Sequence, residues 1–179
     1  MTARYAAILL LGLALATPAV ARQAAPGQPP TREQIVSAAR AVIGKARYAT
    51  LVTLDAGGHP QGRIVDPFEP EGDFAIWIAT NARSRKTGQL EASSKATLVY
   101  FDVASQSYVT VIGHATLVRD PAEKAKRWKE EWAAFYRDRN KGDDYVLIRM
   151  TPTRLEIVSE ALGMRNDPET WRPVVLELR

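Results

Sequence analysis

The sequence predicts a mainly β domain, built as an antiparallel barrel with helices on its periphery. Short segments rich in β-branched and aromatic residues recur along the chain, and most are joined by connections of hairpin length. Parallel strands need crossovers of a dozen residues or more, and most connections here are too short for that. The 179 residues suffice for one domain, and only two or three segments have helical spacing. A peripherally helical antiparallel barrel meets these conditions.

The first predicted element is an amphipathic helix over residues 32–45. Thr31 and Gln34 have the spacing of a capping box, in which each side chain binds a backbone N–H at the helix start. Ile35 and Val42 follow at helical spacing, which places them on one face. We expect this face to pack against the barrel.

Seven short strands are predicted, with turn residues between them. The Asp-Ala-Gly-Gly sequence at 55–58 joins the first two strands as a hairpin, because glycine adopts positive φ without steric cost. Pro152 is expected to separate the last two strands, because proline cannot donate to a sheet ladder. The predicted strands cover 48–54, 59–65, 74–80, 96–102, 108–118, 145–150 and 154–158.

Two further helices are predicted, one over 83–93 and one from Asp120 onward. Asp120, Pro121 and Glu123 supply an N-cap, a proline at the first helical position and an acid in the first turn. Four residues then fall on one face of that helix: Ala125, Trp128, Trp132 and Phe135. The two tryptophans are either a ring-stacking patch or part of the core, and the helical spacing favours the core.

Composition excludes several function classes. The chain has no cysteine, which excludes disulfides, thiolate metal sites and a cysteine nucleophile. The 24 basic and 20 acidic residues give a net charge of only +4, and no basic run follows one helical face. Nucleic acid is therefore not an expected partner. No Ser-His-Asp or paired-carboxylate constellation has a recognisable spacing.

Residues 1–21 have the pattern of a secretory signal peptide. Arg4 precedes an apolar stretch over 6–16, and Ala19-Val20-Ala21 is a small-x-small cleavage pattern. The apolar stretch is shorter than the roughly 20 residues that span a bilayer, and no other segment could cross one. Cleavage would release a secreted or periplasmic protein that begins with a flexible, proline-rich linker over 22–30. The alternative is an uncleaved N-terminal anchor.

The start of the second predicted helix has the chemistry of a phosphate site. A hydrophobic strand ends at Thr80, a polar turn follows, and Arg85 and Lys86 fall in the first turn of the helix. Cations are unfavourable there because a helix N-terminus carries positive partial charge, and a bound anion would resolve the conflict. The hydroxyls of Thr80 and Ser84 would add donors. Arg63, on a strand expected to lie next to the one ending at Thr80, would supply a third cation. The alternative is that these cations are simply solvated.

Short motifs follow one another in a recognisable order over residues 31–160, which we take as one domain followed by a tail, 161–179, packed on or near the barrel. They are Arg63-Ile64-Val65, Thr80-Asn81, Ser84-Arg85-Lys86 with Gln89-Leu90, ATLVYF at 96–101, VTVIGHA at 109–115 and TPTRLE at 151–156. In order and spacing they resemble the pyridoxamine 5'-phosphate oxidase-like FMN-binding split-barrel family, in its general stress protein-like branch.

This resemblance implies an antiparallel split β-barrel that forms a homodimer, with flavin mononucleotide (FMN) in grooves at the interface. Backbone groups would lie against the flavin ring, and cations would hold the phosphate. The residues that the family pattern assigns are Arg63, Arg85 and Lys86 at the phosphate, Ile64 and Val65 at the ring, and Ala79 and Thr80 in the same groove.

Two departures from the oxidase pattern argue against vitamin B6 oxidation. Tyr108 stands where the oxidase has a glutamine, and Trp171-Arg172-Pro173 does not supply the oxidase's C-terminal substrate segment. His59 and His114 are isolated, and a surface position is the favoured interpretation of both, so no metal site is predicted.

Two functions remain open. One is a flavin-dependent oxidoreductase that transfers hydride at the flavin N5 to or from a small-molecule redox partner. The other is a non-catalytic binder of FMN, haem or a deazaflavin.

Overall fold

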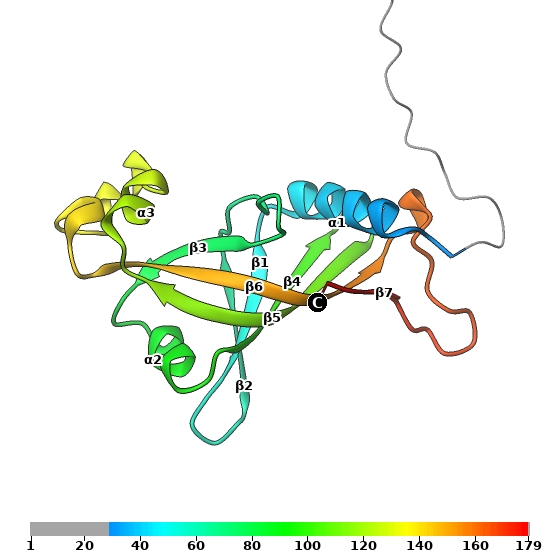
Figure 1. Ribbon diagram of the computed structural model, residues 1–179, viewed down its shortest axis with the longest axis horizontal. Helices are drawn as coiled ribbons and strands as arrows, with labels where there is room; N and C mark the ends of the chain where they lie inside the picture. Colours follow the sequence, from blue (N-terminus) through cyan, green and yellow to red (C-terminus); the bar gives the residue numbers. More distant parts are fainter. Residues whose placement is uncertain (1–28, 179) are drawn as a thin grey trace, which may run out of the picture.

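The computed structural model describes residues 29–178, which form one seven-stranded antiparallel sheet with three α-helices (Figure 1). The strand order is β2-β1-β4-β5-β6-β3, and β7 pairs with β6. The mainly β, antiparallel fold class is confirmed. The predicted leader at 1–21 lies outside the described residues, as does all but the end of the predicted linker. The strands are β1 (Ala49–Leu54), β2 (Pro60–Val65), β3 (Ile76–Asn81), β4 (Lys95–Asp102), β5 (Ser107–Val118), β6 (Tyr145–Val158) and β7 (Val174–Glu177). The helices are α1 (Arg32–Ala46), α2 (Arg85–Ala92) and α3 (Pro121–Lys126), with short 3₁₀ turns at Glu130–Ala134, Arg139–Lys141 and Glu160–Leu162.

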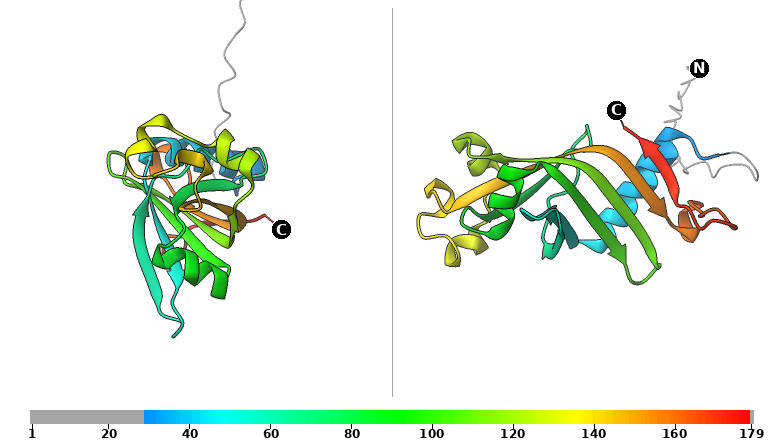
Figure 2. Two further views of the ribbon diagram at one scale, coloured as in Figure 1. Left: turned by 90° about the vertical axis from the view of Figure 1, so that its left-hand side faces the viewer. Right: turned by 90° about the horizontal axis from the view of Figure 1, so that it is seen from below.

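Helix α1 begins with the predicted capping box. The backbone N–H of Gln34 donates to the Thr31 hydroxyl at 3.3 Å, and the backbone N–H of Thr31 donates to the Gln34 side chain at 2.8 Å. Its apolar face, which includes Ile35 and Val42, is buried against the sheet, as predicted. The helix runs along one side of the sheet (Figure 2).

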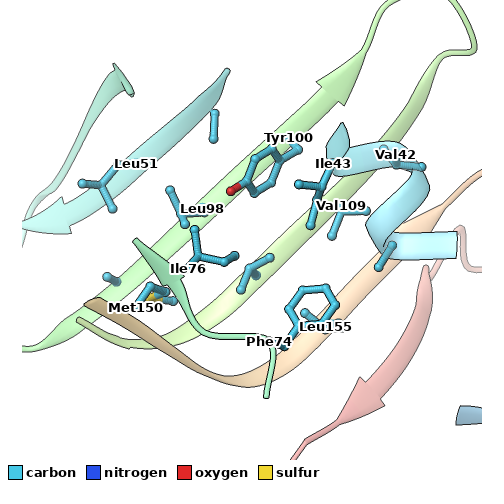
Figure 3. Close-up of a cluster of buried hydrophobic side chains, with 14 of the residues drawn as sticks. Val42, Ile43, Leu51, Phe74, Ile76, Leu98, Tyr100, Val109, Met150 and Leu155 are labelled. Carbon is cyan, nitrogen blue, oxygen red and sulfur yellow. The ribbon is translucent and has the colours of Figure 1, made fainter. Parts of the chain in front are cut away.

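The main core lies between α1 and the curved inner face of the sheet. Residues alternate along the strands, so that every second side chain points inward. Figure 3 shows these side chains converging from α1 and from β1, β3 and its flank, β4, β5 and β6. The labelled members are Val42, Ile43, Leu51, Phe74, Ile76, Leu98, Tyr100, Val109, Met150 and Leu155, all buried.

The hairpin between β1 and β2 forms at the predicted turn. One carboxylate oxygen of Asp55 accepts the N–H groups of Gly57 and His59, both at 2.9 Å. Gly58 adopts φ of +79°, a conformation that favours glycine. The chain therefore reverses where the glycines allow it.

The prediction of two strands separated by Pro152 is wrong, because β6 continues through that residue. Pro152 pairs with Gly113 at a register shift in the β5–β6 ladder, between Ile112 and Gly113. A proline is tolerated at such an irregularity, since its missing N–H interrupts a ladder that is already interrupted. Gly113 is required for the close approach, because an added Cβ would lie 2.2 Å from the carbonyl oxygen of Thr151.

The helix predicted from Asp120 starts there but is much shorter than expected. Asp120 caps α3 by accepting the N–H of Glu123 at 2.9 Å, and the helix ends at Lys126. Ala125 and Phe135 are exposed, so the expected common buried face does not form. Arg127, which follows the last residue of α3, is buried with its guanidinium 3.5 Å from the centre of the Trp77 ring. It pairs with the carboxylates of Glu71 and Glu123, and this contact with β3 and its flank turns the chain away from a helical path.

The C-terminal tail contributes a strand that the sequence pattern did not reveal. β7 pairs with β6 through four residues, from Val174 opposite Ile157 to Glu177 opposite Arg154. The tail and the segment 120–144 lie at opposite ends of the long axis (Figure 1).

Within residues 29–178, no helix combines the length and the hydrophobicity needed to cross a membrane.

Candidate functional site

A groove of about 280 Å³ lies where the ends of β2 and β3 meet α2 and the segment after α3. Three of its lining residues come from the end of β2 and the position after it, two from β3, one from α2 and three from residues 132–136. They are Ile64, Val65 and Asp66, Ala79 and Thr80, Lys86, and Trp132, Phe135 and Tyr136. Five of the eight residues that the sequence singled out thus line one groove.

The two strands that supply this groove are not neighbours in the sheet, which corrects the expectation that Arg63 lies on a strand beside β3. β2 and β3 are at opposite ends of the strand order, and the curled sheet brings them together. Contact is made just beyond β2, where Pro67 bridges Ile78 and the N–H of Phe68 donates to the carbonyl of Trp77 at 2.8 Å. Pro67 has no N–H to donate, so the contact does not extend into a full ladder.

Helix α2 starts at the end of the groove with Ser84 as its N-cap and two cations following. The Ser84 side chain makes no capping hydrogen bond, and the first turn contains no acidic residue. Its hydroxyl is buried and has no hydrogen-bond partner among the described residues. A buried hydroxyl without a partner is uncommon in folded proteins, and a ligand atom could form the missing hydrogen bond. Arg85 is exposed at the first helical position, and Lys86 is half-buried at the second.

Arg63 reaches across β1 toward α2 and is fixed by three hydrogen bonds. One nitrogen of its guanidinium donates to the Thr53 hydroxyl at 2.6 Å and to the Leu51 carbonyl at 3.2 Å. The other donates to the Gln89 side-chain oxygen at 2.8 Å, and the Thr53 hydroxyl donates to the same oxygen at 2.6 Å. Gln89 belongs to one of the short motifs, but the sequence predicts no role for it. The structure shows that it orients Arg63.

The three predicted cations lie close enough to repel one another. Burial lowers the pKa of Lys86, and the charge of Arg63 lowers it further. Burial likewise lowers the pKa of Arg63, with an added contribution from Arg85. None of the three forms an ion pair with a carboxylate within the described part of the chain. The one acid that lines the groove, Asp66, is near Lys129 (3.8 Å) and Arg47 (4.0 Å) instead. The three side chains together give the start of α2 a surplus of positive charge.

The aromatic side of the groove was not assigned to the site from the sequence. Trp132 and Tyr136 are half-buried, whereas 75% of Phe135 is exposed. The only signal for them was the spacing of the tryptophans, for which the core interpretation was favoured over a ring-stacking patch. Trp132 does pack on the smaller core around Trp77, Tyr145 and Leu147, and it lines the groove as well.

Neither histidine lies at the groove. His114 is exposed on the outer face of β5, with its Nδ1 3.0 Å from the Ser94 hydroxyl. His59 is exposed beside Asp55 at 3.3 Å. Both positions agree with the favoured surface interpretation. In residues 29–178, no group of three histidine or acidic side chains could hold a metal ion.

Comparison with known protein families identifies the fold. The family model for pyridoxamine 5'-phosphate oxidase matches residues 35–159. The chain belongs to the pyridoxamine 5'-phosphate oxidase family. The match spans every strand that lines the groove, so the split-barrel assignment made from short motifs is confirmed. Among curated proteins, none matches this member of the family.

Solved structures support the same fold at low sequence identity. General stress protein 26 from Bacillus anthracis str. Sterne is 23% identical, with a TM-score of 0.58, and the match covers 70% of this chain and 92% of that one. A protein related to general stress protein 26 of B. subtilis, from Clostridium acetobutylicum, is 15% identical with a TM-score of 0.68, covering 82% and 96%. A heme binding protein from Mycobacterium smegmatis is 17% identical with a TM-score of 0.56, covering 78% and 56%.

Proposed function

We propose that this protein binds FMN in the groove between β2, β3 and α2, and acts as a flavin-dependent oxidoreductase. The observation that carries the proposal is the group of cations beside the groove, of which Lys86 lines it while Arg63 and Arg85 lie outside its lining. Three cations without carboxylate partners and a buried, unpartnered Ser84 hydroxyl meet at the start of α2. A dianionic phosphate satisfies all of them at once.

The residues present fit both ends of FMN. Arg63, Ser84, Arg85 and Lys86 would hold the phosphate. The backbone and side chains of Ile64, Val65, Ala79 and Thr80 would line the ring system, since they border the same groove as Lys86. Apolar walls with a few placed polar groups are typical of cofactor sites.

FMN would supply hydride chemistry at its N5, and the chain's own residues would bind, orient and exclude water. Asp66 is the acid that lines the groove within the described residues, and its carboxylate lies 3.8 Å from Lys129 and 4.0 Å from Arg47. The site is therefore not built around a side-chain acid or base. Tyr108, at the position of the oxidase's glutamine, argues against vitamin B6 oxidation within this proposal.

Haem is the second candidate, because a solved structure of the same fold is named a heme binding protein. A non-catalytic binder of haem or of a deazaflavin would use the same apolar groove. No histidine lines this groove to serve as an axial ligand, which is why FMN is preferred.

We further propose that the protein is a homodimer that covers the outer face of its sheet. Antiparallel sheets that face water carry polar residues on that face, whereas here apolar side chains recur on β1, β4 and β5. Across neighbouring strands, Val52 pairs with Thr97 and Thr97 pairs with Ile112. Phe101 pairs with Tyr108 in the same way. Phe101 is 53% exposed in the single chain. Light scattering should give about twice the monomer mass, and a monomer that binds FMN tightly would refute the dimer.

Export through the leader at 1–21 is likewise proposed, with a secreted or periplasmic mature protein that starts at Arg22. N-terminal sequencing of the protein from cells decides this. An intact Met1 would contradict it.

The decisive test of the ligand is an absorption spectrum of protein purified from its native compartment, with mass analysis of the released molecule. A flavin spectrum with the mass of FMN is the expected result. A Soret band would replace FMN by haem, and a deazaflavin mass would replace it by that cofactor.

A further inference from the structure

Residues 132–136 form a wall of the groove that neither the family motifs nor the phosphate site explains. We call Trp132, Phe135 and Tyr136 the aromatic wall. All three border the groove, together with Ile64, Val65 and Lys86. The wall belongs to the connection between α3 and β6, far in sequence from the strands opposite it.

Two of the three rings are fixed by packing on neighbouring aromatic side chains. Trp132 contacts Phe68 and Trp128 edge to face, at centroid distances of 6.0 and 6.2 Å. Tyr136 contacts Tyr145 in the same way at 5.0 Å. Such pairs contribute beyond their buried area and hold the rings in one orientation. The inner side of the wall is therefore packed against other rings.

Phe135 differs from the other two residues of the wall because its ring stays exposed to solvent in the folded chain. Its side chain is 75% exposed, while the half-buried rings of Trp132 and Tyr136 flank it in sequence. Ile64, on β2, is 68% exposed and lines the same groove. A single exposed apolar side chain is ordinary. Two large ones bordering one groove, whose end carries Lys86, indicate a ligand that is apolar and planar in one part and anionic in another.

We propose that the aromatic wall binds the planar ring system of the ligand, with Phe135 covering it. This inference rests on the proposed function, and it assigns the ring end of the site to a segment outside the recognised motifs. The cations without carboxylate partners gather at α2, whereas the cation at the wall, Lys129, packs over the Trp132 ring and lies 3.8 Å from the Asp66 carboxylate. The ligand class is a planar, largely apolar ring joined to a phosphate.

The test compares ligands that share the ring but differ in the phosphate. Phe135→Ala is titrated with FMN, with riboflavin, which lacks the phosphate, and with lumiflavin, which is little more than the ring. Affinity should fall about tenfold for all three, which corresponds to about 1.4 kcal/mol and lies within what one aromatic contact contributes. Phe135→Leu should keep part of the affinity, because it preserves apolar area without the ring.

Two control variants isolate the effect. Trp171→Ala removes another aromatic side chain, 77% exposed, from the tail segment at the opposite end of the molecule (Figure 1), and it should bind all three ligands as wild type does. Arg85→Ala should weaken FMN binding and leave lumiflavin unchanged. Phe135 is exposed, so its loss should leave the melting temperature of the ligand-free protein within a degree or two of wild type.

The outcomes distinguish a failure of the aromatic-wall proposal from a failure of the FMN proposal. Wild-type protein that binds no flavin but binds haem would refute the FMN proposal. Haem is also a planar ring, so Phe135→Ala must then weaken haem binding for the aromatic wall to stand. Wild-type affinity of Phe135→Ala for every ring ligand would overturn the inference. Loss confined to FMN would also overturn it, as would a wild-type protein that binds none of these ligands.

Discussion

Replacing Lys86 by methionine should separate the phosphate site from the fold. Lys86→Met keeps an unbranched side chain, shorter by one heavy atom, and removes the charged ammonium group. Lys86 makes no side-chain hydrogen bond within the described residues, and its neighbour Arg63 lowers its pKa by repulsion. Nothing that stabilises the ligand-free protein is lost with the charge. Its free energy of unfolding should therefore stay the same or rise, while its affinity for FMN falls.

The magnitude follows from the position of each cation. A hydrogen bond to a charged partner contributes about 1.5–3 kcal/mol, which is one to two decades of affinity. Lys86 is half-buried, so we expect a loss between these limits, whereas the exposed Arg85 should lose about one decade in Arg85→Ala. Arg63→Ala is less clean, because it also removes the donor to the buried Thr53 hydroxyl.

The pH dependence of binding gives a second measure of the same charge. Burial and Arg63 lower the pKa of Lys86, so in the ligand-free protein it loses its proton below the unfolded-state value of about 10.4. Between the lowered pKa and that value the unfolded state binds more protons, and folding stability rises with pH. A phosphate dianion favours the charged form, so FMN affinity should fall as pH rises through the lowered pKa. Lys86→Met should remove that fall.

The assay is a fluorescence titration of FMN and riboflavin at fixed salt, beside urea denaturation of each ligand-free variant. Riboflavin lacks the phosphate, so its affinity should be nearly the same in wild type and Lys86→Met. Equal losses for both ligands would show a fold defect. Unchanged FMN binding would show that Lys86 is not at the phosphate.

Three other predictions concern Gln89, Gly113 and Phe101. Gln89→Leu should weaken FMN binding about threefold to tenfold through misplacement of Arg63, and a double-mutant cycle with Arg63→Ala should be non-additive; additive losses would contradict a positioning role. Gly113→Ala should destabilise the protein by about 2–3 kcal/mol in urea denaturation, because its Cβ would collide with the Thr151 carbonyl, and wild-type stability would contradict this. Phe101→Glu should convert the proposed dimer to a monomer in light scattering, and an unchanged mass would place the interface elsewhere.

Local signals predicted the elements that depend on neighbouring residues. The capping box at Thr31, the glycine turn after Asp55 and the helix start at Asp120 all form as expected. Each of these is decided within four or five residues, by backbone N–H groups that need a partner or by a glycine that accepts an unusual φ. The start of α2 belongs with them, because Arg85 and Lys86 occupy its first turn as predicted.

Features that depend on distant residues were missed. Pro152 ends a strand by any local rule, yet β6 runs through it because Gly113, on another strand, lets the chains approach. Residues after Lys126 have helical spacing, yet Arg127 leaves the helix to lie over the Trp77 ring and pair with Glu71. No short window of sequence around Pro152 contains Gly113, and none around Arg127 contains Trp77 or Glu71.

The groove depends on both neighbouring and distant residues, and the charges of Arg63, Arg85 and Lys86 show how the two combine. The local sequence predicts two cations at the start of α2. The curled sheet brings Arg63 close to them, where its charge lowers the pKa of Lys86. Three cations gathered without carboxylate partners cost the ligand-free protein stability through repulsion and desolvation. Solvated side chains would spread apart to avoid that cost. Arg63 is instead fastened by Thr53 and Gln89 with bonds of 2.6 and 2.8 Å, which keeps its charge beside the others. A guanidinium that is held beside other cations despite their repulsion is typical of a binding site for an anion. This is the strongest physical support for the proposed cofactor site.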